Sequence, residues 1–254
     1  MSISPELKSQ ILEYIKQPIP QNEDITLVES SIPILFFGNI EKASVATVSI
    51  NPSFGEFKKN GKLLSIKEKR FTDRELLGVK DTERLNDYQA ERVYKSLKDY
   101  FTHKKIYDNW FKKVNDRIKN LIDVSYYEGT MVNLDIYPWA TEKIWGELNN
   151  KKAKEAKSAA LKSYRKTNIL KNILLHKNFE YVYINGATVY EEMKQYFEDM
   201  IREHSVDVSG ETWKIYEGKL DNGTKLIGLN CYIPSTPIKT KTLLYLFDIL
   251  KQYM

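Results

Sequence analysis

A side-chain amide that could hold a water molecule lies directly after the first predicted buried strand of the chain. Residues 44–50 are apolar and β-branched, which is typical of a strand buried on both faces, and Asn51-Pro52 follows at once. Asn before Pro makes a tight, rigid turn. An amide held there can orient water, although the same dipeptide also fits a simple turn. Glu56, slightly further on, could act as a general base.

A second polar pair lies at the end of the next predicted strand, residues 130–137. Asn133 and Asp135 alternate with apolar neighbours, so both side chains are expected on one face of the sheet. Tyr137 and Trp139 could stack on a flat ligand. Two interpretations stay open: a ligand-reading site, or a turn capped by Asp135 with both aromatic rings in the core.

The third polar segment joins the last predicted strand to the final helix. Its prolines stiffen the loop, and hydroxyl groups near helix N–H groups suit the binding of a phosphate. Two lysines just beyond the loop add positive charge. A proline-containing N-cap is the alternative explanation of the same residues. The phosphate interpretation selects Pro234, Ser235, Thr236, Lys239 and Lys241.

Strands alternate with amphipathic helices along the chain, which predicts a mainly parallel sheet with helices on both faces. We therefore expect a three-layer α/β/α fold around a four-stranded sheet, as a single domain over residues 1–254. Asp221-Asn222-Gly223 predicts a hairpin that feeds the last strand. Ligands bind beyond the carboxyl ends of such strands, where all three polar segments lie. Strands are predicted at 44–50, 130–137, 180–185 and 224–233, with 212–220 as the other strand of the hairpin. Helices are predicted at 5–16, 83–101, 107–122, 150–175, 186–203 and 239–253, and a mostly irregular segment at 51–80.

The scarcity of cysteine and histidine limits the available chemistry. The single cysteine, Cys231, excludes an internal disulfide, a cysteine zinc site and an iron–sulfur cluster, which needs about four thiolates. The three histidines are scattered along the chain and form no metal-binding motif. We therefore expect neither a metal nor a cofactor.

The net charge of +5 arises from 39 basic and 34 acidic residues, and the excess is concentrated in two stretches. Residues 58–70 carry six positive side chains and one negative, and residues 151–166 carry seven and one. These stretches are either phosphate contacts or solvated lysine-rich surfaces. No apolar run approaches the roughly 20 residues of a membrane span. Since the N-terminus also has no signal-peptide pattern, a cytoplasmic location is expected.

Asn51-Pro52-Ser53, placed after a buried strand, resembles the first motif of the uracil-DNA glycosylase superfamily. The resemblance is closest to the Asn-Pro-Gly form found in the mismatch-specific and single-strand-selective branches, with Ser53 in place of the glycine. The order of predicted elements over residues 32–250 is also similar to that superfamily. Its iron–sulfur branches are excluded by the cysteine count.

The resemblance implies a role for each polar segment. The first motif positions the hydrolytic water in that superfamily, which implies Asn51, and an aromatic ring just after it stacks on the flipped base, which implies Phe54. The polar residue that ends the second strand reads the base edge, which implies Asn133, with Asp135 as the competing choice. The last motif, a His-Pro-Ser type loop, aligns with Ile233-Pro234-Ser235 and here lacks its histidine.

The function implied is that of a monofunctional DNA glycosylase, which removes a flipped base and leaves an abasic site. The base would be uracil-like or a bulky modified base, such as one in bacteriophage DNA, with a role in antiviral defence. Thr141, Lys143 and Trp145, with Trp139, could then line an enlarged pocket. A nucleotide or nucleoside hydrolase and a non-catalytic DNA-binding module of the same fold are the alternatives.

DNA is the expected partner, bound by a monomer. No lysine lies within the three polar segments before residue 239, so a covalent lyase step is not expected. The candidate catalytic residues are Asn51, Asp135 and Glu56, the candidate base-binding residues are Ser49, Phe54, Asn133, Tyr137 and Trp139, and the candidate DNA-backbone contacts are Pro52, Ser53, Pro234, Ser235, Thr236, Lys239 and Lys241.

Overall fold

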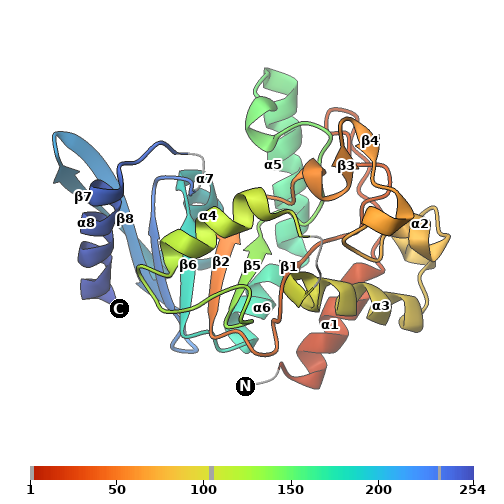
Figure 1. The fold of residues 1–254 in the computed structure, drawn as a ribbon, viewed down its shortest axis with the longest axis horizontal. Coiled ribbons are helices and arrows are strands. Elements are labelled where there is room, and N and C mark those ends of the chain that lie inside the picture. Colours follow the sequence, from red (N-terminus) through yellow and green to blue (C-terminus); the bar gives the residue numbers. More distant parts are fainter. Residues whose placement is uncertain (1–2, 103–105, 234–235) are drawn as a thin grey trace.

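The computed structural model describes residues 3–102, 106–233 and 236–254, and its centre is a seven-stranded sheet (Figure 1). Four strands pair in parallel at the middle of the sheet, in the order β5-β2-β6-β9. Their apolar, β-branched sequences predict burial on both faces, and almost all of their residues are buried. These strands are β2 (Val45–Ser49), β5 (Met131–Asp135), β6 (Tyr181–Asn185) and β9 (Lys225–Leu229).

Antiparallel strands extend both edges, so the sheet is wider than the four strands predicted from the sequence. β1 (Phe36–Phe37) pairs with β5, and β8 (Glu211–Lys219) followed by β7 (Ile201–Val208) continue the sheet beyond β9. The hairpin between β8 and β9 is confirmed, and Gly223 in its turn has φ of 90°, which favours glycine. The mixed α/β class is thus confirmed, while the number of strands is corrected to seven.

β7 occupies a segment for which the sequence predicts the end of a helix. α7 spans only Ala187–Phe197, and the chain turns into the strand at Ile201. At the edge of the sheet, β7 buries only its two end residues, Ile201 and Val208, so its polar centre shows no apolar alternation. Gly218 on β8 permits a close approach, because a Cβ there would lie 2.0 Å from the backbone oxygen of Met200.

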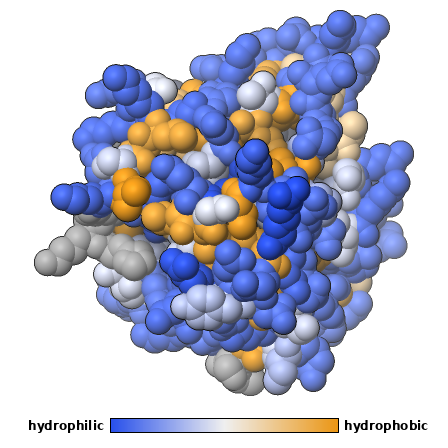
Figure 2. Space-filling model, turned by 90° about the vertical axis from the view of Figure 1, so that its right-hand side faces the viewer, coloured by the Kyte–Doolittle hydropathy of each residue, from blue (hydrophilic) through white to orange (hydrophobic). Residues whose placement is uncertain are grey.

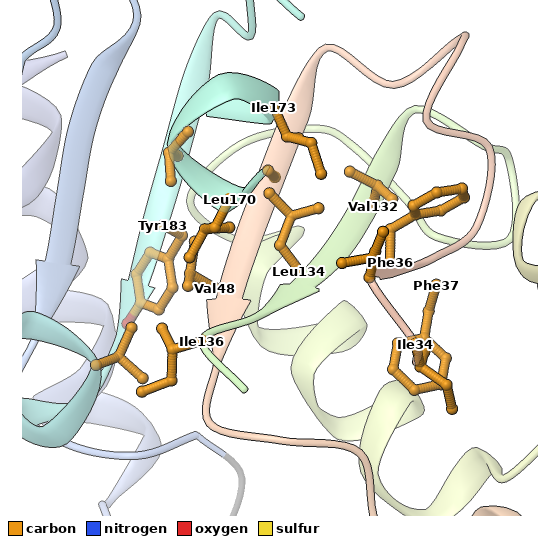
Figure 3. Close-up of a cluster of buried hydrophobic side chains, with 14 of the residues drawn as sticks. Ile34, Phe36, Phe37, Val48, Val132, Leu134, Ile136, Leu170, Ile173 and Tyr183 are labelled. Atoms are coloured by element: carbon orange, nitrogen blue, oxygen red, sulfur yellow. The ribbon is translucent and has the colours of Figure 1, made fainter. Parts of the chain in front are cut away.

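Helices cover both faces of the sheet. α4 (Asp108–Ile118) crosses the front of the sheet in Figure 1, where the rings of Phe111 and Phe37 lie 4.9 Å apart. Leu170 of α6 and Leu134 of β5 belong to the buried apolar cluster of Figure 3, which packs that helix on the sheet. The remaining helices are α1 (Pro5–Ile15), α2 (Arg74–Leu77), α3 (Asp87–Lys98), α5 (Lys151–Lys166), α6 (Ile169–His176) and α8 (Thr240–Leu250).

Two further segments differ from the prediction. The sequence predicts one helix over 150–175, but α5 ends and α6 begins around Asn168, whose φ of 56° interrupts the right-handed helix. The segment 51–80, expected to be mostly irregular, contains the short hairpin of β3 (Lys58–Lys59) and β4 (Lys62–Leu63). Its turn is made by Asn60 and Gly61, both with positive φ.

The face that carries α2, β3 and β4 is mainly hydrophilic, with apolar side chains gathered near its middle (Figure 2). Ile66, between β4 and α2, is 67% exposed. No helix among residues 3–102, 106–233 and 236–254 is long and apolar enough to cross a membrane. Within the same ranges, no group of three or more His, Cys, Asp and Glu side chains is arranged to hold a metal ion.

Candidate active site

A pocket of about 480 Å³ opens at the carboxyl ends of β2 and β5. Ser49 and Asn51 line it from the end of β2, and Asn133 and Asp135 line it from the end of β5. Parallel pairing explains this convergence, because Thr47 lies beside Asn133 and Ser49 beside Asp135 in the register of the two strands. The turn after β2 adds Pro52, Ser53, Phe54 and Glu56. The first two polar segments of the sequence therefore form one site.

Asn133 is held in one orientation at this pocket. Its Oδ1 accepts hydrogen bonds of 2.9 Å from the hydroxyl groups of Thr47 and Ser49. Tyr126 holds Thr47 in turn through a hydrogen bond between their hydroxyl groups. Asn133 Nδ2 donates to Asp135 Oδ1 at 3.2 Å. Because Asp135 Oδ1 accepts from the amide nitrogen, a flip of the amide would bring two acceptor oxygens together and break this hydrogen bond.

Asp135 is 2% exposed, and only one of its carboxyl oxygens has a partner among the described residues. Oδ1 accepts the hydrogen bond from Asn133, whereas Oδ2 has no hydrogen-bond partner in the described part of the chain. Burial raises the pKa of Asp135 to about 8, and the hydrogen bond from Asn133 opposes the rise. The neutral carboxylic acid is therefore the main form at pH 7.

Glu56 is equally buried, but several groups bind its carboxyl group. The hydroxyl of Tyr100 donates to it at 2.8 and 3.0 Å, and Arg70 Nη1 lies 3.8 Å from Oε2. The Tyr100 oxygen also accepts a hydrogen bond of 2.9 Å from the backbone N–H of Tyr107. Burial raises the pKa of Glu56 to about 8, while Arg70 and Tyr100 oppose the rise and Asp135 adds to it.

The amide nitrogen of Asn51 is bound by the protein. Nδ2 lies 3.3 Å from the carbonyl oxygen of Trp139, 3.2 Å from the hydroxyl oxygen of Thr141 and 3.2 Å from the carbonyl oxygen of Pro52. No donor among the described residues bonds Asn51 Oδ1. A fixed amide with a free carbonyl oxygen can accept a hydrogen bond from a water molecule and orient it.

Aromatic rings form much of the pocket wall. They belong to Phe37, Phe54, Tyr107, Trp110, Phe111, Trp145 and Tyr232. Phe54 is 37% exposed, and the rings of Trp110 and Tyr232 lie 6.4 Å apart. Tyr107 packs so closely on Gly55 that a Cβ at this glycine would lie 2.9 Å from the ring. Flat rings around a pocket suit a planar heterocycle, which can stack on them.

Residues 141–146, which we name the wall segment, complete the lining through Thr141, Lys143, Ile144, Trp145 and Gly146. Lys58 of β3 binds Glu142 in this segment at 2.6 Å. Lys157 of α5 donates to the carbonyl oxygen of Trp145 at 3.2 Å and lies 5.7 Å from the centre of its ring. Each of the two basic stretches is therefore attached to the wall segment.

Two of the candidate base-binding residues lie outside the pocket lining. Tyr137 and Trp139 are 2% and 1% exposed and belong to the hydrophobic core. The ring of Tyr137 packs on that of Trp145 at 5.1 Å, so it supports the pocket wall from behind. The large apolar area of both rings favours burial in the core, which was the second interpretation of this segment.

The third polar segment contributes little to this pocket. Thr236 accepts a hydrogen bond of 3.0 Å from the backbone N–H of Tyr232, and Tyr232 itself lines the pocket. Thr236, Lys239 and Lys241 lie outside the pocket lining, the two lysines exposed at the start of α8. The remaining candidates of this segment, Pro234 and Ser235, lie outside the described residues.

Several lining residues are not selected by the sequence. Tyr107, Trp110 and Phe111 lie at the start of α4, where they belong to the apolar face of an amphipathic helix. Such a face has the same pattern whether it packs on a core or borders a pocket. Tyr232 directly follows Cys231, and its position one residue before a selected loop is the only signal for it.

The two basic stretches divide into paired and exposed lysines. Lys69 is buried in an ion pair with Asp73, and Lys58 and Lys157 hold the wall segment. Paired lysines of this kind are not available for another anion. Lys59 is exposed but lies 3.9 Å from Glu68. The other exposed lysines of the two stretches include Lys62, Lys67, Lys151, Lys152 and Lys154.

Comparison of the sequence with protein-family models and with curated proteins finds no match.

Proposed function

We propose that the chain is a monofunctional DNA glycosylase of the uracil-DNA glycosylase superfamily, which hydrolyses the N-glycosidic bond of a flipped base. The observation that carries this proposal is the convergence of Asn51, Phe54 and Asp135 on one aromatic-lined pocket at the carboxyl ends of parallel strands. By the resemblance to that superfamily, the first motif and the ring after it hold the water and stack on the base. The end of the second strand reads the base edge, through Asn133 or, as the competing choice, Asp135. A base must leave the duplex to enter such a pocket.

In this scheme Asn51 orients the attacking water through its free Oδ1, while Nδ2 is fixed by Trp139 and Thr141. A neutral amide is a poor base, so another group must take the proton. Glu56 lines the same pocket, and a pKa raised to about 8 is close to the pH at which a general base works best. General-base catalysis by such a carboxylate typically gives about 10²–10⁴-fold.

The size of the pocket supports a base larger than uracil. Its volume of about 480 Å³ lies within the range of about 300–1,000 Å³ that is usual for small-molecule sites, so a ring with a substituent is compatible with it. A bulky modified base, such as one in bacteriophage DNA, is therefore the substrate we favour, and the biological role that fits it is defence against phage.

DNA binding is supported by the position of the basic stretches on both sides of the wall segment. Lys58 on β3 and Lys157 on α5 attach to this segment, and exposed lysines follow along each element. Lysines at the rim of a pocket can bind the phosphates that flank a flipped nucleotide. Such binding depends strongly on salt, because each phosphate contact releases a counterion.

The test is abasic-site formation in DNA that carries uracil, hydroxymethylcytosine or glucosylated hydroxymethylcytosine, read out by alkaline strand cleavage. We expect cleavage of DNA with a bulky modified base, and we expect Asn51→Ala to lose most of it while keeping its affinity for DNA. Asn120→Ala, an exposed asparagine at the end of α4, is the matched control and should keep full turnover. A borohydride-trapped adduct would contradict the monofunctional scheme.

The same assays separate the alternative functions. A gel shift without abasic sites on any of these DNAs indicates a non-catalytic DNA-binding module. Release of a base from free nucleosides or nucleotides, with no gel shift, indicates a nucleoside or nucleotide hydrolase. Efficient release of uracil with no action on the modified DNAs would overturn the preference for a bulky base.

A further inference from the structure

The carboxyl group of Asp135 has one end fixed by the protein and one end without a partner. Asn133 Nδ2 donates to Oδ1, and the orientation of that amide is set by the hydroxyl groups of Thr47 and Ser49. Oδ2 is fully buried and unbonded within the described residues, and Asp135 lines the pocket. Buried polar atoms in native proteins nearly always have a hydrogen-bond partner, so an unbonded one in a pocket points to a ligand.

We propose that Asp135 binds the heterocycle as a neutral carboxylic acid, donating from Oδ2–H and accepting at Oδ1, and so selects a base edge with an acceptor beside a donor. Uracil offers such an edge at O4 and N3–H, and cytosine offers one at N3 and its amino group. 1,3-Dimethyluracil, whose N3 carries a methyl group in place of the proton, offers acceptors but no donor and therefore has no such edge. This inference rests on the proposed function only in taking a nucleobase as the ligand.

The surroundings of Asp135 favour the neutral acid. The aromatic walls and the 2% exposure of Asp135 disfavour a charge, and burial raises the pKa of the carboxyl to about 8. A carboxylic acid kept neutral by an apolar site can donate a hydrogen bond at neutral pH. An oxygen of an ionised Asp135 could only accept, which would leave the carbonyl O4 of uracil facing a second acceptor.

The titratable groups that face Asp135 are Glu56 from the turn after β2, Tyr126 before β5, Tyr164 on α5 and Tyr232 after β9. Burial raises the pKa of each of these tyrosines, so all three are neutral at the pH values of interest. Glu56 is the one group of this set that titrates in the same range as Asp135. A test must therefore separate these two carboxyl groups.

The test is calorimetric titration of the full chain with 1-methylcytosine, 1-methyluracil and 1,3-dimethyluracil, in which the methyl group on N1 stands for the glycosidic bond. At pH 6.5 the first two compounds should bind at least about tenfold more tightly than 1,3-dimethyluracil, since one missing hydrogen bond costs about that factor. The affinity for 1-methylcytosine, which does not ionise in this range, should fall about tenfold for each pH unit above 8.

Variants assign the effect to Asp135. Asp135→Asn keeps a donor and an acceptor, so it should bind 1-methylcytosine within about threefold of the wild type and lose the pH dependence. Asp135→Ala should weaken binding at least about tenfold. Glu56→Gln keeps an acceptor for Tyr100 and should retain the pH dependence. Asp123→Asn, at an aspartate whose side chain is 93% exposed, is the matched control and should behave as the wild type.

Three results would overturn the inference. One is binding of 1,3-dimethyluracil as tight as that of 1-methyluracil, which means that Asp135 accepts no hydrogen bond from N3–H of the base. Another is loss of pyrimidine binding in Asp135→Asn, and the third is the absence of binding of all three compounds. None of these results depends on cleavage of DNA, so failure of this inference and failure of the glycosylase proposal are distinguishable.

Discussion

Glu56 and Asp135 are two carboxyl groups in one pocket, each 2% exposed, and they differ in what binds them. Glu56 accepts hydrogen bonds from Tyr100 and lies 3.8 Å from Arg70. Asp135 accepts one hydrogen bond from Asn133 and has a second oxygen with no partner among the described residues. Burial raises the pKa of both groups to about 8.

The comparison shows that a raised pKa does not by itself indicate how a buried carboxyl group is bound. Desolvation acts on both groups alike, because both are removed from water. The hydrogen bonds differ: Glu56 links the turn after β2 to Tyr100 and Arg70, whereas Asp135 keeps bonding capacity for a ligand. Unused hydrogen-bonding capacity is therefore the better sign of a binding group.

The largest expected effect concerns the pH dependence of stability in Asp135→Asn. The pKa of Asp135 rises from its ordinary 3.8 to about 8 in the folded state, so the folded chain keeps a proton that the unfolded chain releases. Asp135 should therefore lower the stability of the wild type as pH rises from about 4 to 8, by up to about 1.4 kcal/mol for each unit, and Glu56 should add a similar slope. Asparagine does not titrate, so Asp135→Asn should keep only the slope of Glu56.

Urea unfolding of both proteins at several pH values measures this difference. The two should have similar free energies of unfolding near pH 4, and Asp135→Asn should be the more stable at pH 8. Asp123→Asn is the control, since its exposed carboxyl should leave the slope unchanged. Equal slopes for Asp135→Asn and the wild type would show that Asp135 is not held neutral by the fold.

The next effect concerns Glu56→Ala, which should lower the free energy of unfolding by about 2 kcal/mol at pH 4, where the raised pKa of Glu56 no longer affects stability. The change leaves the guanidinium of Arg70, 16% exposed, without its carboxyl partner and the hydroxyl of Tyr100 without its acceptor. Asp135→Ala removes only one hydrogen bond and should cost about half as much. Equal losses in urea unfolding would remove the distinction between the two groups.

A smaller effect is expected for Tyr100→Phe, about 1 kcal/mol of stability. The hydroxyl group both donates to Glu56 and accepts from the backbone N–H of Tyr107, and phenylalanine keeps the ring packing. Because the hydrogen bond from Tyr100 lowers the pKa of Glu56, its loss should move that pKa further upward. Carboxyl carbon shifts followed by NMR against pH measure both predictions, and an unchanged pKa of Glu56 would contradict the second.

The smallest effect is expected for Ser49→Ala, at most about 1 kcal/mol. Asn133 Oδ1 then keeps the hydroxyl of Thr47 as a donor, so the amide retains its orientation toward Asp135. Thermal unfolding and the preference among methylated bases should both change little. A large change in that preference would mean that Ser49 contacts the ligand directly and does more than hold Asn133.

The middle of the sheet could be predicted from the sequence, and its edges could not. β2 and β6 are continuous apolar runs because they are buried on both faces. β7 lies at an edge of the sheet, with mostly polar residues between Ile201 and Val208. It follows α7 closely, and the helical pattern of the sequence extends past the end of α7 into the first residues of β7. Pairing with β8, a tertiary interaction, decides its conformation.

The residues at the strand ends could likewise be predicted, because alternation places Asn133 and Asp135 on one face and the turn after β2 beside them. The aromatic walls of the pocket could not be predicted from the sequence. Trp110 lies on the apolar face of a helix, which has the pattern of any core-facing helix, and only the packing of α4 across the sheet brings its ring to the pocket. Trp139 is also a tryptophan near the predicted site, but it is buried in the core and does not line the pocket.

The hydrogen bonds from Thr47 and Ser49 to Asn133 join residues that are 86 and 84 positions apart in the chain. Such contacts close long loops, whose entropy cost is met only when the strands on either side are paired. A partly folded chain without the pairing of β2 and β5 therefore has no binding site, and a ligand binds the native sheet alone. By mass action, a ligand at 100 times its Kd should raise the free energy of unfolding by about 2.7 kcal/mol.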